Sequence, residues 1–377
     1  MNRVDRIEFP LKRSDAESLG SGSVVRSERA SAELRAGRPV VIEGDGAMLA
    51  VLALDTASPE AFRAFARAAD GRHGLYLTAP RAAALGIESE NGVVVPLGRQ
   101  SYEQACRVGY MREGVAPEHW TAPQPLCIEG AGLARLALLL PAIVVSSEAA
   151  SAAALADCVR VRSGDLIEAM ETSAQEFEIV ARTSVPLKGI EAAECVVFRG
   201  GLAQRDQIAI VVGDPDPQRP VPVRVHSSCL TGDLFGSLKC DCGDQLRRSL
   251  VTMQERGGGV LIYLDQEGRG TGIAAKMRAY GFQCEGLDTL DADAQLGFGT
   301  DERRYGAAVA MLLALGHTRI DLLTNNPLKV AHLRAAGIEV VGRTPAVGEV
   351  TSQNRDYLRT KVARAGHMID VDALPTR

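Results

Sequence analysis

Three cysteines lie close together in the stretch 224–245, which reads R-V-H-S-S-C-L-T-G-D-L-F-G-S-L-K-C-D-C-G-D-Q. Ten residues separate Cys229 from Cys240, and a single residue separates Cys240 from Cys242. Thiolates are soft ligands that suit zinc, and three protein ligands leave a fourth position for water, as in catalytic zinc sites. We therefore predict that these cysteines bind one zinc ion per chain. His226 either supplies a fourth ligand or faces the substrate.

The spacing alone leaves other interpretations of the cysteines open. Free cysteines are often buried in a core as small apolar side chains, whereas a disulfide within C-x-C is geometrically awkward. Eight cysteines among 377 residues do not make a disulfide framework. A reducing, cytoplasmic compartment is therefore expected, and the N-terminus has no apolar segment of the kind found in signal peptides.

The composition is that of an ordinary globular protein, with 46% hydrophobic and 24% charged residues. A net charge of −5 gives no overall nucleic-acid signature, and only 4% of residues are aromatic, which argues against a base-stacking surface. The apolar run 136–145 contains Pro141 and is too short to span a bilayer. We expect neither a nucleic acid nor a membrane as partner.

The cysteine stretch resembles the zinc motif of GTP cyclohydrolase II, the enzyme that opens riboflavin synthesis. The resemblance continues in the same order through D-Q-E-G-R-G-T-G, K-M-R-A-Y, Q-L-G-F-G-T-D-E-R-R and L-L-T-N-N-P-L-K, from about residue 182 to residue 368. It implies zinc-dependent hydrolysis of GTP to formate, pyrophosphate and 2,5-diamino-6-ribosylamino-4(3H)-pyrimidinone 5′-phosphate. It also implies Mg²⁺ bound with the triphosphate and a homodimer.

The resemblance also implies roles for individual residues. Asp301 matches a proton acceptor, Arg303 matches an arginine proposed to attack the α-phosphate, and Tyr280 matches a tyrosine near the purine that is a plausible proton donor. The positions expected to bind substrate are Arg224, Val225, His226, Ser227, Ser228, Gln245, Glu267, Gly268, Arg269, Thr289, Thr324 and Lys329.

Two of the expected substrate loops also follow from the residues themselves. Arg269 comes after a predicted buried strand and offers a bidentate fork for phosphate, and the glycines around it permit close backbone approach. Asn326 is expected to cap a helix with Pro327 at its first position, which places Lys329 where a helix N-terminus favours an anion. The simpler alternatives are a solvated Lys329 and an Asp301 that merely caps a helix over 303–315.

Three positions beside these motifs depart from the family pattern. The family commonly has Glu, Arg and Ile where this chain has Ser228, Asp265 and Thr271. These departures keep open a related enzyme that acts on another purine or pyrimidine. A further alternative is a non-catalytic, zinc-stapled regulatory or nucleic-acid-binding module, which predicts a fourth metal ligand and a basic surface.

The first part of the chain has the signals of an α/β domain. A helix from Ala30 ends at Gly37, and two strands over 39–43 and 48–54 flank the turn E-G-D-G. Ser58 is expected to cap the next helix, before a strand that begins at Gly74 and a short helix that Gly86 closes.

This order of elements resembles 3,4-dihydroxy-2-butanone-4-phosphate synthase. The acidic loop of that family is reduced here to Glu43 and Asp45, and its later His-containing motifs are not visible. We interpret the domain as a degenerate, non-catalytic relative, which argues against a bifunctional enzyme. An unrelated α/β domain is the alternative.

The sequence as a whole predicts an α/β (α+β) fold with two domains, each a mixed sheet with packed helices, the C-terminal one carrying the zinc site. The expected parts are a flexible arm over 1–24, the degenerate domain over 25–170, the cyclohydrolase domain over 171–370 and a tail over 371–377. Because every matched catalytic motif lies beyond residue 182, residues 1–165 are expected to be dispensable for ring opening.

Inside the cyclohydrolase domain, strands are expected over 195–198, 208–212 and 221–226. Antiparallel pairing of these strands is expected to bring Arg224 and His226 beside the zinc loop. A helix is expected over 244–255, followed by a buried strand.

Overall fold

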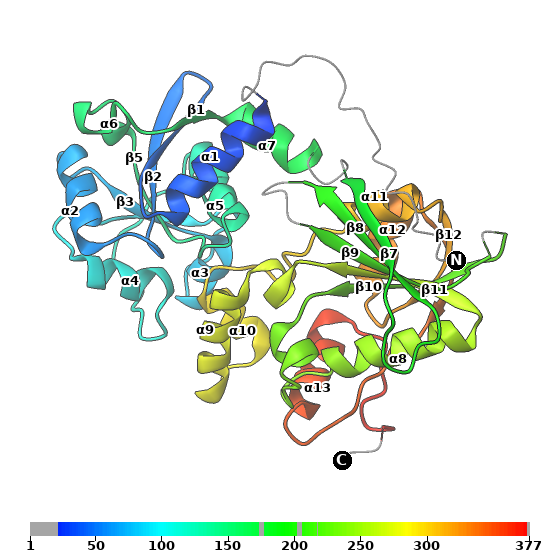
Figure 1. Cartoon of the computed structure of the whole chain (residues 1–377). Helices are drawn as coiled ribbons and strands as arrows, with labels where there is room; N and C mark the ends of the chain where they lie inside the picture. Colours follow the sequence, from blue (N-terminus) through cyan, green and yellow to red (C-terminus); the bar gives the residue numbers. More distant parts are fainter. Residues whose placement is uncertain (1–21, 173–176, 202–205, 217, 375–377) are drawn as a thin grey trace. The chain divides into compact units, whose positions relative to one another are not determined.

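The computed structural model describes residues 22–172, 177–201, 206–216 and 218–374 (Figure 1). The described chain divides into two compact units that interrupt each other in sequence. The N-terminal unit contains residues 22–171 and 268–302, and the C-terminal unit contains residues 172–267 and 303–374. Most of the arm predicted over 1–24 lies outside the described residues. Its last two residues begin helix α1 (Ser23–Arg35), so this helix starts seven residues earlier than predicted.

The N-terminal unit is built on a mixed six-stranded sheet with the strand order β4-β3-β5-β2-β1-β6. Strand β1 runs parallel to β6, and all other neighbouring strands are antiparallel. The predicted hairpin is confirmed, with φ angles of 50° at Asp45 and 75° at Gly46, as a tight two-residue turn requires. The strands are β1 (Val40–Gly44), β2 (Ala47–Ala53), β3 (Gly74–Leu77), β4 (Val93–Pro96), β5 (Ile143–Ser146) and β6 (Arg160–Arg162).

The helices of this unit begin where the sequence carries capping signals. Ser58 accepts a hydrogen bond of 3.1 Å from the backbone N–H of Ala61, which confirms the predicted cap of α2. The short helix closed by Gly86 is also confirmed as α3. After α1, the α-helices of this unit before residue 173 are α2 (Pro59–Ala68), α3 (Ala79–Ala84), α4 (Tyr102–Tyr110), α5 (Pro125–Leu136), α6 (Ser147–Ala150) and α7 (Ser163–Thr172).

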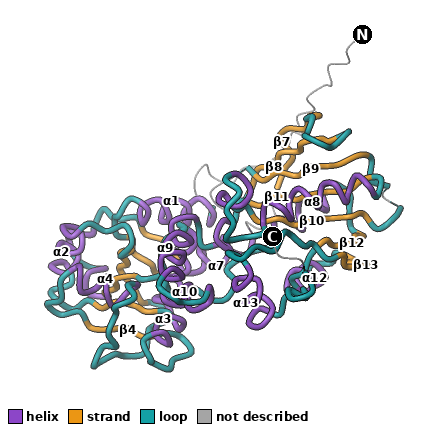
Figure 2. Tube along the Cα trace, turned by 90° about the horizontal axis from the view of Figure 1, so that it is seen from below, coloured by secondary structure: helices purple, strands orange, loops and turns teal. Residues whose placement is uncertain are grey.

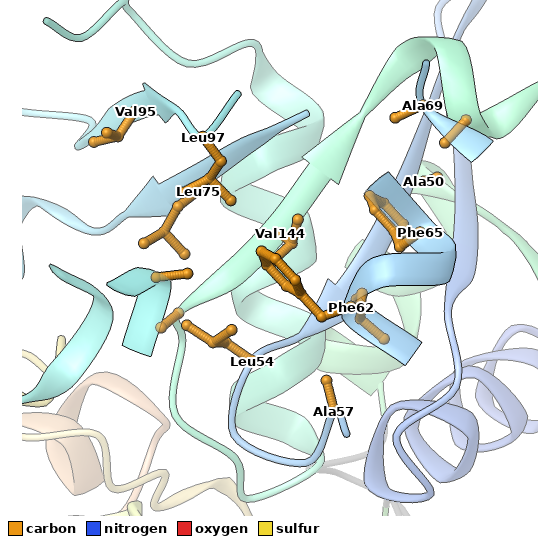
Figure 3. Close-up of a cluster of buried hydrophobic side chains, with 14 of the residues drawn as sticks. Ala50, Leu54, Ala57, Phe62, Phe65, Ala69, Leu75, Val95, Leu97 and Val144 are labelled. Carbon is orange, nitrogen blue, oxygen red and sulfur yellow. The ribbon is translucent and has the colours of Figure 1, made fainter. Parts of the chain in front are cut away.

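Apolar side chains cover both faces of the six-stranded sheet. Because side chains alternate along a strand, Leu52 of β2 enters one buried cluster and Val51 enters the other. Figure 3 shows the first cluster, in which Phe62 and Phe65 of α2 share the core with Val144 of β5. A two-faced core of this kind is typical of a sheet covered by helices on both sides.

Two helices that come much later in the chain complete the N-terminal unit. Helices α9 (Ile273–Cys284) and α10 (Thr289–Gln295) pack on each other, and α10 packs on α3 (Figure 1). Ala275 and Ala279 of α9 and Leu296 form a buried cluster with Leu140, which lies just before β5. The segment 268–302 is therefore structurally part of the N-terminal unit.

The C-terminal unit is built on a mixed seven-stranded sheet with the order β13-β12-β10-β11-β9-β8-β7. The predicted antiparallel arrangement is right for β8 and β9 but wrong for β10, which lies between β11 and β12 and runs parallel to both. The strands are β7 (Phe177–Ser184), β8 (Ala193–Gly200), β9 (Gln207–Gly213), β10 (Val221–Ser227), β11 (Gly258–Leu264), β12 (Arg319–Leu323) and β13 (Glu339–Thr344).

Helices pack on both faces of this sheet. Val223 and Val225 of β10 enter the core cluster that includes α11, so the intervening Arg224 projects from the opposite face. Helix α8 packs on β10 and β11 (Figure 2). The helix predicted over 244–255 is confirmed as α8, and its Met253 is fully buried in the cluster on that side. The helices are α8 (Cys242–Glu255), α11 (Gly306–Ala314), α12 (Pro327–Ala335) and α13 (Arg355–Ala365).

The predicted fold class is confirmed, because both units are mixed sheets with packed helices. One simple alternative from the sequence is wrong: α11 begins at Gly306, so Asp301 does not cap it. In the described part of the chain, no helix is both long and apolar enough to cross a membrane.

Candidate metal centre and substrate site

The three predicted cysteine ligands come together in the C-terminal unit. Cys229 follows β10, whereas Cys240 precedes α8 and Cys242 is its first residue, and the three sulfur atoms lie within 4.8 Å of one another. The Sγ atoms of Cys229 and Cys240 are 3.6 Å apart. A tetrahedral zinc with Zn–S bonds of about 2.3 Å needs sulfur atoms about 3.8 Å apart. The donor set therefore fits a zinc ion with three protein ligands.

Two glycines allow the loop between the cysteines to fold so tightly. A Cβ atom on Gly232 would lie 2.6 Å from Cys240 Sγ and 3.1 Å from Cys229 Sγ. A Cβ atom on Gly243 would lie 2.2 Å from the carbonyl oxygen of Gly232. A side chain at Gly232 would displace a cysteine sulfur, and one at Gly243 would displace the backbone of Gly232, so both glycines are part of the metal cradle.

The close approach of the three thiols affects the protonation of Cys242. Hydrogen bonding with the neighbouring thiols, followed by burial, raises the pKa of the Cys242 thiol well above its ordinary value. The start of α8 favours the thiolate, because a helix N-terminus carries partial positive charge. A metal ion must therefore displace protons from these thiols when it binds.

Asp233, which the sequence reasoning missed, organises the loop around Cys229. Its carboxylate accepts hydrogen bonds from the backbone N–H of Cys229 at 3.0 Å, the Tyr263 hydroxyl at 2.9 Å and His226 Nε2 at 3.0 Å. His226 therefore pairs with Asp233 and lies outside the group of metal-ligating atoms found among the described residues. Of the two roles proposed for His226, the structure gives no support to that of a fourth ligand.

The pairing with Asp233 also sets the protonation of His226. The side chain is 2% exposed, and burial lowers the pKa of His226 despite the nearby carboxylate. A carboxylate only accepts, so Nε2 of the neutral ring carries the proton and Nδ1 keeps its lone pair. Nδ1 is buried and has no hydrogen-bond partner among the described residues.

Asp241, between the last two cysteines, is the second carboxylate that the sequence reasoning missed. Lys361 of α13 lies 3.2 Å from it, and Gln245 of α8 donates to its other oxygen. Gln245 in turn accepts from Arg224, which also donates to the carbonyl oxygen of Leu323 at 2.9 Å. Burial alone would raise the pKa of Asp241, but the ion pair with Lys361, a backbone hydrogen bond and the charge of Arg224 together outweigh it, and the pKa is lowered.

The carboxyl ends of three parallel strands meet at the edge that carries the cysteines. Ser227 ends β10, Glu267 follows β11, and Thr324 follows β12. Glu267 accepts a hydrogen bond of 2.6 Å from the backbone N–H of Leu230 and so ties the cysteine loop to the end of β11. This edge is where open α/β sheets bind their ligands.

Several buried polar atoms near the end of β10 have no hydrogen-bond partner in the part of the chain that the structure describes. They are the hydroxyl oxygens of Ser227 and Ser228 and the Nε of Arg224. Buried polar groups are normally paired, so such a group of atoms at a strand end fits a site that takes a polar ligand.

The helix start predicted around Asn326 is confirmed. Its side chain accepts from the backbone N–H of Leu328 at 2.9 Å, and Pro327 occupies the first position of α12. Lys329, however, is 5% exposed and donates to the carbonyl oxygen of Val225 at 2.7 Å. The alternative of a solvated lysine is therefore wrong.

The predicted site residues between Glu267 and Arg303 belong to the N-terminal unit. They are Gly268, Arg269, Tyr280, Thr289 and Asp301. Gly268 and Arg269 both have φ angles near the left-handed region, at 63° and 62°. This conformation is strained for arginine and is typical of functional loops. The Thr271 hydroxyl, one of the departures from the family pattern, donates to the carbonyl oxygen of Gly268 at 2.8 Å and closes the turn.

Arg269 pairs with Asp293 of α10. Burial raises the pKa of Asp293 to about 6, against the opposing effect of the Arg269 guanidinium. The carbonyl oxygen of Arg269 accepts from the backbone N–H of Glu302 at 3.2 Å. This bond holds the stretch that contains Asp301 beside the turn.

Tyr280 lies on α9, with Lys276 Nζ 5.7 Å from its ring centroid. Thr289 is the first residue of α10, and its hydroxyl accepts from Gln283 at 3.4 Å. Arg303 belongs to the C-terminal unit and lies 5.9 Å from the ring centroid of Tyr305. The predicted site residues therefore divide between the two units.

Comparisons with known proteins show the same relationship as the motifs. The sequence profile of the GTP cyclohydrolase II family matches residues 178–345. A GTP cyclohydrolase-2 from Xylella fastidiosa (strain 9a5c) is 55% identical over 359 residues, which cover 94% of this chain and 90% of that protein. The chain belongs to the GTP cyclohydrolase II family.

Other relatives of this GTP cyclohydrolase II family member differ in how much of the chain they match. A GTP cyclohydrolase-2 from Azospirillum brasilense is 39% identical over 361 residues, covering 90% of this chain and 93% of that protein. The riboflavin biosynthesis protein RibBA of Bacillus cytotoxicus is 47% identical over 174 residues, covering 46% of this chain and 44% of that protein. Full-length similarity therefore extends to the two GTP cyclohydrolase-2 proteins.

A solved two-domain 3,4-dihydroxy-2-butanone 4-phosphate synthase, RibBX from A. baumannii, was also found. It is 18% identical, covers 86% of this chain and 100% of its own, and has a TM-score of 0.31.

Replacement of one cysteine tests the metal centre of this cyclohydrolase-family protein. Cys240→Ser removes one of three thiolates, so the purified variant should retain much less zinc than the parent, which should hold about one zinc per chain. Elemental analysis measures this. Cys284→Ser, at an exposed cysteine outside the cluster, is the control and should keep its zinc. If Cys240→Ser retained as much zinc as the parent, the assignment of the cysteines as zinc ligands would be wrong.

A second prediction concerns Lys361, which lies beyond the residues matched by the family profile. Lys361→Met leaves the buried Asp241 carboxylate without its cation, which typically costs about 3 kcal/mol or more. Denaturant unfolding should show this loss, and the variant should lose zinc faster to a chelator. Because the native pKa of Asp241 is lowered, its contribution is present above the unfolded pKa and is lost as pH falls through the folded one.

Lys188→Met, at an exposed lysine of the same unit, is the matched control for this variant. Equal stability and equal zinc loss in the two lysine variants would show that Lys361 has no part in holding the metal loop.

Proposed function

We propose that this protein hydrolyses GTP, opening the imidazole ring and releasing formate and pyrophosphate. The product would be 2,5-diamino-6-ribosylamino-4(3H)-pyrimidinone 5′-phosphate, the first intermediate of riboflavin biosynthesis. The observation that carries the proposal is full-length similarity to a GTP cyclohydrolase-2, together with the three-thiol cluster at a strand edge. On the family resemblance we also propose that the protein is a cytoplasmic homodimer.

Cys229, Cys240 and Cys242 would hold the zinc ion, whose chemistry is to make water a nucleophile near neutral pH. Two water molecules are needed at carbon 8 of guanine, since both of its bonds to nitrogen are broken when formate leaves. The nitrogens that leave carbon 8 need protons, and the attacking water must lose one. The resemblance assigns these transfers to Asp301 and Tyr280.

The end of β10 supports binding of the polar edge of a purine. The Ser227 and Ser228 hydroxyls each offer a donor and acceptors, and both are buried without a partner among the described residues. His226 offers an acceptor at Nδ1, and its orientation is fixed through Asp233. Arg224 of β10 and Gln245 of α8, linked by a hydrogen bond, would support this edge, with Val225 and Thr324 in the adjoining backbone.

The phosphate end of GTP needs positive charge. Arg269 would provide a fork for phosphate, exchanging its pairing with Asp293 for the nucleotide, with Gly268 allowing close approach. On the family resemblance, Glu267 and Thr289 would also contact the nucleotide. Lys329 is buried against β10, which supports an electrostatic role at the strand edge. Mg²⁺ would accompany the triphosphate, and a third water would break the bond between the α- and β-phosphates, aided by Arg303.

Two alternatives receive less support. A zinc-stapled binding module predicts a fourth metal ligand, and the group found among the described residues contains three. A cyclohydrolase for a different purine or pyrimidine rests on Ser228, Asp265 and Thr271. Of these, Thr271 closes the turn at Gly268 and Asp265 is exposed at the end of β11, so Ser228 is the departure that lies among the buried polar groups.

The direct experiment is to incubate the purified protein with GTP and Mg²⁺ and to measure formate and pyrophosphate in the same samples. We expect both products in equal amounts. ATP and ITP are the matched comparisons, since both keep the triphosphate and imidazole ring and differ at the pyrimidine edge. Absence of formate from GTP, or its preferential release from another nucleotide, would overturn the assignment of the substrate.

The same assay separates the roles of the cysteines and the arginine. Cys240→Ser should abolish formate release and retain part of the pyrophosphate release, because the thiolates serve chemistry at carbon 8. Arg303→Ala should lower both products by a hundredfold or so if the phosphate step comes first, since lost charge stabilisation typically costs this much. Near-parental production of both by Arg303→Ala would exclude the arginine from the mechanism.

A further inference from the structure

The segment 268–302 carries five of the predicted site residues that lie outside the zinc loop and its strands: Gly268, Arg269, Tyr280, Thr289 and Asp301. In sequence it lies among the cyclohydrolase motifs. In structure it belongs to the N-terminal unit, where α9 and α10 share a buried cluster with Leu140. The residues that hold this segment in place therefore lie in the first part of the chain.

Arg81 of α3 is the central anchor of the segment. Its side chain is 1% exposed, and burial lowers its pKa to about 10, so the guanidinium remains charged near neutral pH. It donates to the carbonyl oxygen of Gln295 at 3.0 Å and to the Gln295 side chain. Its other donors bind the carbonyl oxygens of Val108, Arg107 and Met111 at 2.8–3.0 Å. One buried cation thus joins α10 to the end of α4.

Thr78 fixes the next turn of the segment. Its buried hydroxyl donates to the carbonyl oxygen of Gly297 at 2.7 Å. Gly297 has a φ of 86°, and a Cβ atom there would lie 3.1 Å from both Thr78 Oγ1 and Pro141 Cγ. This close approach sets where the chain leaves α10 on its way to Asp301.

Three ion pairs join the segment to the N-terminal residues at further points. Arg278 of α9, two residues before Tyr280, lies 2.6 Å from Asp55, whose carboxylate is 9% exposed. Arg112 lies 2.7 Å from Glu285, at the end of α9, and also donates to its carbonyl oxygen at 2.8 Å. Arg135 lies 3.5 Å from Glu302, the neighbour of Asp301. The ties therefore fall close to the two residues expected to move protons.

We propose that the N-terminal residues 22–171 serve the cyclohydrolase reaction by positioning the segment 268–302, with Arg81, Thr78 and Arg112 as positioning residues. The proposal rests on the proposed function. It assigns a task to a domain that was expected, from the position of the catalytic motifs, to be dispensable for ring opening. None of the three residues lies in a cyclohydrolase motif, so their effect on catalysis would pass through the segment.

The test uses the full-length, zinc-loaded protein with two mild substitutions, alone and combined. Thr78→Val removes the hydroxyl bound to Gly297 without changing the volume much, and Arg112→Ala removes an exposed tie to Glu285. Thr56→Val and Arg38→Ala are the matched controls. Thr56 donates to the carbonyl oxygen of Leu34 and Arg38 pairs with Glu33, so neither contacts the segment.

Two readouts are measured for each variant: kcat and KM for formate release from GTP, and hydrogen–deuterium exchange of peptides over 273–298 and 230–245. The combined Thr78→Val and Arg112→Ala variant should lose on the order of tenfold or more in kcat, because small misplacements of reacting groups are costly. Exchange should rise over 273–298 and stay unchanged over 230–245, and zinc content should match the parent. The combined Thr56→Val and Arg38→Ala control should keep the parental kcat even if it lowers Tm by as much as the combined Thr78→Val and Arg112→Ala variant does.

Parental kcat and parental exchange in the combined variant would overturn the proposal. So would a fall in kcat no larger than that of the controls at equal Tm. If the parent itself releases no formate from GTP, the proposed function fails. The exchange measurement still decides whether the N-terminal residues hold the segment.

Discussion

Close packing of Gly232 against Gly243 is the constraint on which the candidate metal centre depends. The carbonyl oxygen of one lies where the Cβ of the other would be, and the sulfur of Cys240 occupies the space beside Gly232. The distance between these two backbone segments is too short for a side chain on either residue, so both must be glycine. The loop from β10 can therefore turn back on the start of α8, which brings the sulfur atoms from both ends of the loop within reach of one cation.

Around this turn, the C-terminal unit buries several charges, and each has a partner of opposite sign or a set of donors. Asp233 accepts three different hydrogen bonds, and Asp241 faces Lys361 and Gln245. A buried charge without such partners would cost more than the fold gains elsewhere. The polarity of the site is thus maintained by residues from β11 and α13 that do not themselves carry the expected chemistry.

Much of the fold was predictable where the signals were local. The cap at Ser58, the hairpin at Asp45 and Gly46, and the start of α12 at Asn326 each depend on residues within one turn of each other. Helix α1 was partly missed, because its buried face is formed by small residues such as Ser27, Ala30 and Ser31. Such a face gives no apolar periodicity.

The predictions that were wrong or incomplete concern residues and strands whose partners lie far away in the sequence. The neighbours of β10 are strands whose paired residues follow it by 37 and 99 positions, and no local pattern shows which strand lies beside which. The clustering of the three cysteines was predictable from their spacing, whereas the role of Asp241 depends on a partner 120 residues later in the chain. Asp233 and Asp241 both lie in the cysteine stretch. The presence of acidic residues among the clustered cysteines was therefore the signal by which they could have been found.

The interleaving of the two units has a consequence for how the chain folds during synthesis. Thr78 and Gly297 are 219 residues apart, so the N-terminal unit lacks α9 and α10 until most of the chain has been made. At a translation rate of about 5–20 residues per second, this delay is on the order of ten seconds or more. During that time the ribosome holds a chain whose α3 face is uncovered and whose Arg81 has no Gln295 to bind. The last step in completing the N-terminal unit therefore coincides with the emergence of the strands that finish the C-terminal sheet.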